Sequence, residues 1–150
     1  MAELPDFMYM DDDKPRSKYI EHMFEAVFFG RHLDALFREN FETYVRTFFA
    51  IEDVPIEIYT DESAALKFVS IFGLVSVTPI CDEYRADPDF VHCEFQSVIH
   101  PKAKALDAYK GDLKCSPTCA PTVHRAILLA FIEFLREITV AHISYSKENE

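Results

Sequence analysis

Two cysteines and one histidine in the last third of the chain form its nearest approach to a chemical site. Cys115 and Cys119 flank a Ser-Pro-Thr spacer, and His124 follows five residues later. Thiolates and imidazole are the preferred ligands of zinc, and spacers of this length suit tetrahedral geometry. No second closely spaced pair supplies a fourth ligand. We therefore expect no metal here, and a plain loop that carries two thiols.

The histidines show no catalytic pattern. Nucleophilic catalysis needs a nucleophile next to a base, and the six histidines are scattered along the chain without a recognisable motif. Neither G-x-G-x-x-G nor G-x-x-x-x-G-K-[ST] occurs, and the chain has only three glycines for a phosphate-binding loop. We expect a protein that is not an enzyme and holds no cofactor.

The charge balance limits the classes of partner. Asp and Glu number 26 against 15 Lys and Arg, which gives a formal net charge of −11. Such a chain repels phosphate backbones and anionic lipids, so nucleic acid is a poor partner. The acidity favours a basic partner, or it serves solubility alone. The most apolar stretch, residues 126–135, is well short of the roughly 20 residues of a spanning helix, so no integral membrane segment is expected.

The first residues carry no pattern of a secretory signal peptide. Residues 1–14 are acidic and polar around a few apolar side chains, without a basic region and an apolar run. We therefore expect a cytoplasmic protein whose four cysteines are reduced.

Aromatic residues at helical spacing predict several amphipathic helices. The chain has 14 Phe and 7 Tyr, and apolar residues recur every three or four positions over five stretches. These stretches are residues 17–29, ended by Gly30, then 33–48, 64–72 behind a cap at 61–63, 88–100, and a last helix from about Thr122. Residues 54–59 alternate and form either a short strand or, as we prefer, an extended connection.

Residues 74–80 are expected to form the central element. They are nearly all apolar, although Val75, Val77 and Thr78 favour a strand and Pro79 would kink a helix. We predict an all-α fold in which this segment is a buried helix, hydrophobic nearly all round, among amphipathic neighbours. The domain would span residues 17–143, between a flexible acidic leader (1–16) and a polar tail (144–150).

The order of these segments resembles the Bcl-2 family of apoptosis regulators. The likeness rests on LFRENFETYVRTFF, KFVSIFG and the buried LVSVTPI. Phe72-Gly73 resembles the Trp-Gly pair that opens the family's central helix, and Phe41 to Tyr44 resembles the start of its groove-lining second helix. Leu74 stands where relatives have an arginine that pairs with the bound ligand. A C-terminal anchor is absent, as in shortened viral relatives.

The resemblance implies a Bcl-2-like bundle with a pro-survival role. Such a protein sequesters pro-apoptotic BH3-motif helices in an apolar groove, and it would act in the host cytoplasm if viral. An open groove would also favour a homodimer. The implied groove residues are Phe41, Tyr44, Val45, Phe48, Phe68, Phe72, Gly73 and Leu74. Each of these side chains could equally be part of the core.

Two alternatives remain open. One is a helical host-interaction scaffold that binds a different partner through acidic or aromatic surface. The other is a small α+β ligand-binding or enzymatic domain, in which residues 55–59 and 74–78 are strands and the aromatic side chains line a pocket.

Overall fold

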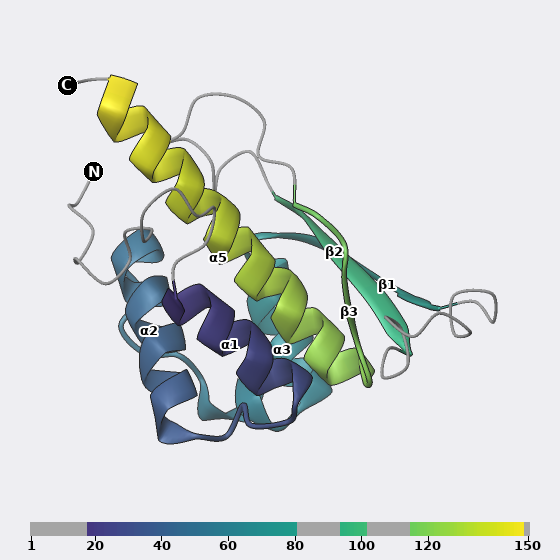
Figure 1. Cartoon of the computed structure of the whole chain (residues 1–150). Coiled ribbons are helices and arrows are strands. Elements are labelled where there is room, and N and C mark those ends of the chain that lie inside the picture. Colours follow the sequence, from purple (N-terminus) through teal and green to yellow (C-terminus); the bar gives the residue numbers. More distant parts are fainter. Residues whose placement is uncertain (1–17, 81–93, 102–114, 149–150) are drawn as a thin grey trace.

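A long C-terminal helix, α5 (Val123–Glu148), occupies the centre of the computed structural model, which describes residues 18–80, 94–101 and 115–148. Every residue from 126 to 135 is buried. A helix that is apolar all round has to be covered on all sides. A small sheet packs on one side of α5, and the other helices pack on the opposite side (Figure 1).

The N-terminal half supplies the helical layer. It contains α1 (Lys18–Phe28), α2 (Ala35–Phe49), the short 3-10 helix η2 (Ile56–Tyr59) and α3 (Glu62–Ser70). Gly30 follows α1 with a φ of 79°, a left-handed conformation that ends the helix at little cost. Asp61 caps α3, because its carboxylate accepts the Ala64 N–H at 3.0 Å. The first two predicted helices and the capped third one are confirmed.

Three antiparallel strands form the opposite layer. They are β1 (Gly73–Pro79), β2 (Phe95–Pro101) and β3 (Thr118–Ala120), in the order β1-β2-β3. The buried Ser97 fastens this sheet to the central helix. Its hydroxyl donates to the Ala126 carbonyl of α5 at 2.5 Å and lies 3.1 Å from the Thr118 hydroxyl. The face that carries Ser97 and Ile99 therefore packs on α5.

An aromatic cluster joins the helices. The Phe131 ring of α5 is fully buried and has five aromatic neighbours, with ring centroids 5.2–6.5 Å away. These neighbours are Phe41, Phe49, Phe68, Phe72 and Phe134. Tilted and edge-on aromatic pairs of this kind add to the stabilisation that burial provides. The cluster therefore ties α2, α3 and the start of β1 to the central helix.

One acidic side chain lies inside this apolar helix. Glu133 is 1% exposed, and both of its carboxylate oxygens accept hydrogen bonds from Arg136, at 3.0 Å from Nε and 2.5 Å from Nη2. Arg136 also pairs with Glu137. The hydrogen bond to Glu133 is the main reason why the pKa of Arg136 is raised. A buried carboxylate is tolerated only with a partner of this kind.

The expected all-α fold is wrong, because the structure combines helices with an antiparallel sheet. Residues 73–79 form the strand β1 and not a central helix. The β-branched side chains of Val75, Val77 and Thr78 explain the difference, since they fit a pleated surface better than a helix. Leu74 is 68% exposed, so this segment is not covered on all sides. The central, all-round apolar helix exists, but it is α5.

Three smaller expectations also change. Residues 95–101 form the strand β2, although a helix over residues 88–100 was expected. The first part of that expected helix lies outside the described residues, and so does the expected leader (1–16). The expected polar tail from residue 144 is helical as far as Glu148. Residues 56–59 form η2, which is neither a strand nor an extended connection.

Replacing the central ring of the aromatic cluster should make the protein less stable. We expect Phe131→Ala to lower the free energy of unfolding by about 3–5 kcal/mol, because it leaves a cavity between helices that cannot close fully. Urea denaturation followed by circular dichroism measures the change. The control is Leu74→Ala, at an exposed site, which should cost about 0.5 kcal/mol or less. Equal losses for both variants would contradict the placement of Phe131 at the centre.

Candidate functional site

Most of the residues implied for a ligand groove lie in the core. Phe41, Tyr44 and Val45 of α2 are fully buried, and Phe68 and Phe72 are at most 5% exposed. Three of these rings meet around Phe131 and so contact α5, not an open surface. These five side chains therefore have almost no exposed surface to offer to a visiting helix.

The other three implied groove residues lie in different surroundings. Phe48 is half-buried, whereas Leu74 points away from the core on β1. Gly73 is buried against β2, where an added Cβ would lie 2.5 Å from the His100 carbonyl oxygen. That close approach between strands explains why glycine stands here.

The structure does not bring the two cysteines and the histidine of the candidate zinc site together as ligands. Cys119 is disulfide-bonded, whereas Cys115 is a free thiol. His124 places its Nε2 at 2.8 Å from the Ile58 carbonyl oxygen. Among the described residues no group of three or more potential ligands comes together. The expectation of reduced thiols is therefore wrong for Cys119.

A surface depression lies between α1 and β3. Both elements pack on α5, but they do not pack closely on each other. The gap between them is an open hollow of about 400 Å³, which we call the α1–β3 hollow. Its lining is mainly apolar: Phe24 and Phe28 from α1, Phe29 directly after it, Leu129 from α5, and Pro117, Thr118 and Cys119 at β3. Volumes of this size are typical of binding sites.

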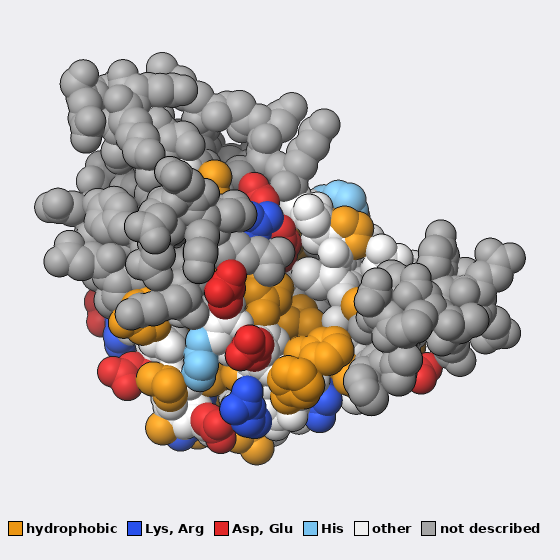
Figure 2. All heavy atoms as spheres, viewed as in Figure 1, with side chains coloured by type: hydrophobic (Ala, Val, Ile, Leu, Met, Phe, Trp, Pro, Cys, Tyr) orange, Lys and Arg blue, Asp and Glu red, His pale blue; other side chains and the backbone are white. Residues whose placement is uncertain are grey.

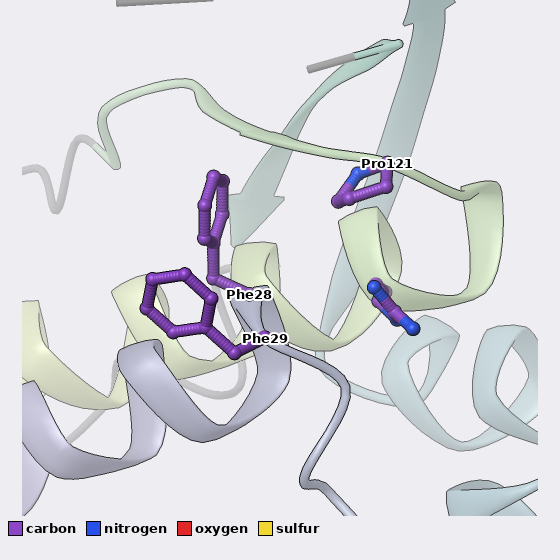
Figure 3. A pocket seen from close by; sticks show the side chains of 4 residues that line it. Phe28, Phe29 and Pro121 are labelled. Carbon is purple, nitrogen blue, oxygen red and sulfur yellow. The ribbon is translucent and has the colours of Figure 1, made fainter. Parts of the chain in front are cut away.

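Two adjacent phenylalanines dominate the hollow. Phe28 and Phe29 lie next to each other at the end of α1, and the Phe28 ring points towards the segment that leads to Pro121 (Figure 3). Their rings are edge to face, with centroids 5.2 Å apart, and Phe29 is 65% exposed. Figure 2 shows hydrophobic side chains gathered over this part of the surface, with charged side chains around them. The hollow thus leaves a large apolar ring in water.

Opposite charges border the hollow. Glu25 lines it on α1, and a smaller adjoining space of about 240 Å³ leads past Pro121 to Arg125. Within the described side chains, neither Glu25 nor Arg125 forms an ion pair. Arg125 lies over Gly30, where an added Cβ would be 2.6 Å from Nη2. Both charges therefore remain available to a bound group.

A pair of histidine rings lies next to this charged end. The rings of His32 and His124 are 5.4 Å apart and nearly perpendicular. Burial lowers the pKa of His32, and the neighbouring His124 and Arg125 lower it further. His32 is thus held neutral around pH 7, in the turn that follows α1.

The hollow is mainly apolar and has one acidic and one basic side chain at its border, which suits the binding of an apolar group. The Thr118 hydroxyl contacts Ser97. Burial, with Glu133 and Glu137 nearby, raises the pKa of the Cys115 thiol to about 12, so little of it is ionised at neutral pH. Sequence reasoning missed the hollow because it depends on an unforeseen sheet. One signal was present: Phe29 follows Phe28 directly, and consecutive helix residues do not share a face, so one aromatic ring falls outside the buried stripe.

Comparison of the chain with protein-family models, with curated proteins and with solved structures found no match. The resemblance to the Bcl-2 family therefore rests on the quoted segments alone. None of the described helices has the length and the apolar composition that crossing a membrane requires.

The neutral state of His32 predicts a pH dependence of stability. Its imidazole titrates near 6.5 when unfolded and at a lower pH when folded, so the unfolded chain binds more protons between these values. The stability it contributes is complete above pH 6.5 and is lost as the pH falls towards the folded pKa. Urea midpoints at about pH 7.5 and 5.5 should differ less in His32→Gln than in the wild type. The control is His100→Gln, at an exposed site, which should keep the wild-type difference between the two urea midpoints. If His32→Gln also kept that difference, His32 would not be the group responsible for it.

The two cysteines of the Ser-Pro-Thr loop should differ in reactivity. Iodoacetamide at about pH 8 should label Cys115 slowly in the folded protein, because little of its thiol is ionised at that pH. Unfolding without reductant should expose Cys115 fully and leave Cys119 unlabelled, and reductant should then release Cys119. Peptide mapping by mass spectrometry reads both sites. Labelling of Cys119 in the unreduced protein would rule out its disulfide.

Proposed function

We propose that this chain is a protein-binding module that takes an apolar side chain of its partner into the α1–β3 hollow. The observation that carries the proposal is the 65% exposed ring of Phe29 beside Phe28, in an apolar hollow of about 400 Å³. Partly buried aromatic side chains in such depressions are the usual anchors of binding energy. The proposal is a form of the α+β ligand-binding alternative.

The charges at the border favour a protein segment over a lipid. A segment with a basic residue on one side of its apolar anchor and an acidic residue on the other would pair with Glu25 and Arg125. An anionic lipid would use Arg125 alone, and the net charge of −11 opposes its approach. Opposite charges also fix the direction in which a segment lies, because the reversed orientation places like charges together.

The pro-survival role implied by the Bcl-2 resemblance stays a prediction. It requires a helix-lined groove beside Phe41, Phe68 and Phe72, and these rings lie in the core. A host-interaction scaffold with another partner fits the α1–β3 hollow without that requirement, although not as an all-helical fold. We therefore do not carry binding of BH3-motif helices into the proposed function.

A peptide selection tests the proposal. A displayed library of random twelve-residue peptides should yield binders with one large apolar residue between a basic and an acidic one. Phe29→Ser should weaken the binding of a selected peptide about tenfold, which corresponds to about 1.4 kcal/mol. Fluorescence anisotropy with labelled peptide measures the dissociation constant.

Two matched variants complete the experiment. Leu74→Ser removes an equally exposed apolar side chain from β1 and should change the dissociation constant less than twofold. The double variant Glu25→Arg, Arg125→Glu should reverse the order of charges in the selected peptides. The proposal fails if no selected peptide depends on Phe29, or if Leu74→Ser weakens binding as much as Phe29→Ser does.

A further inference from the structure

The outer edge of β1 carries a row of backbone groups that no described strand pairs with. The sheet order β1-β2-β3 places β1 at one edge, on the far side of β2 from β3 (Figure 1). The Ile80 N–H donates to the Glu94 carbonyl, in line with the β1–β2 register, which matches Ser76 with Val98. The even-numbered residues of β1 therefore direct their backbone N–H and C=O groups towards β2.

It follows that the residues of odd number on β1 direct their backbone groups outward. The N–H and C=O groups of Val75 and Val77 point away from β2, and Pro79 offers only a carbonyl there. Proline is tolerated in a strand where its missing N–H would have faced outward. The outer edge is thus regular enough to receive another strand.

The charge pattern indicates which strand fits. Charged residues make up 27% of the chain, yet residues 73–79 contain none. Edge strands are usually protected by charged side chains, and Pro79 at the last position is the one protective residue in β1. A second copy also carries a net charge of −11, so two copies repel least where they meet through uncharged surface.

We propose that β1 pairs with β1 of a second copy, antiparallel across a two-fold axis at Ser76. This register overlaps the whole of both strands and joins two three-stranded sheets into one of six strands. Val75 of each copy then exchanges backbone hydrogen bonds with Val77 of the other, and Leu74 lies opposite Thr78 on the open face. The edge is self-complementary, as a two-fold contact requires.

The area of contact predicts a weak dimer. One strand pair buries less than the roughly 1,600 Å² of a standard stable interface. Ile71 and Leu74, which are 61% and 68% exposed, are the apolar side chains near the edge that could add to it. We therefore expect a dissociation constant on the order of 10–100 μM, lowered by added salt as repulsion between the acidic copies is screened.

Sedimentation velocity tests the dimer on the full chain. At about 200 μM the wild type should be mostly dimeric, and Ser76→Lys should be monomeric because it places two like charges at the axis. Gln96→Lys adds the same charge to the same open face, on the central strand β2, and should still dimerise. Circular dichroism shows that each variant folds. A monomeric wild type, or a dimer that Ser76→Lys leaves intact, overturns the proposal.

Disulfide trapping tests the register. In this register the two Ser76 residues lie opposite each other without sharing backbone hydrogen bonds, and their Cα atoms are roughly 4.5 Å apart. Ser76→Cys should therefore form a disulfide between the two copies on oxidation. The two Thr78 residues lie about 13 Å apart in the same register, so Thr78→Cys should stay uncrosslinked. Non-reducing electrophoresis reads both variants. Crosslinking of Thr78→Cys in place of Ser76→Cys overturns the proposed pairing.

Discussion

Burial of α5 on every side is the constraint on which the rest of the structure depends. Residues 126–135 offer no polar face to water, so the helix needs one layer on each side. The aromatic cluster around Phe131 supplies the helical layer, and Ser97 fixes the sheet by a hydrogen bond to the Ala126 carbonyl. Each layer meets α5 through contacts of a different kind, and neither could cover it alone.

The α1–β3 hollow is a consequence of that arrangement. Because α1 and β3 both pack on α5 but not closely on each other, a gap remains between them. Phe28 and Phe29 at the end of α1 cannot both turn inward, since consecutive helix residues point in different directions. The surplus ring is therefore left at the surface, between the charges of Glu25 and Arg125. At the other edge of the sheet, β1 has no further strand beside it among the described residues.

The sequence predicted the elements with clear helical periodicity and missed those decided by tertiary contacts. The helices α1, α2, α3 and α5 follow from apolar spacing, from Gly30 and from the Asp61 cap. Residues 74–80 are a short apolar run that fits a buried helix or a strand, and the antiparallel partner residues that decide between them lie 16 to 26 residues further along the chain. The hollow could not be foreseen, because a surface between two elements requires their placement and not only their existence.

The ion pair inside α5 has a consequence for the order of folding. Glu133 and Arg136 stand one helical turn apart, so the carboxylate meets its counterion as soon as that turn forms. No long-range contact is needed to neutralise the charge, unlike an ion pair that bridges two layers. The helix can therefore enter the interior with its charge already compensated, whichever layer docks first.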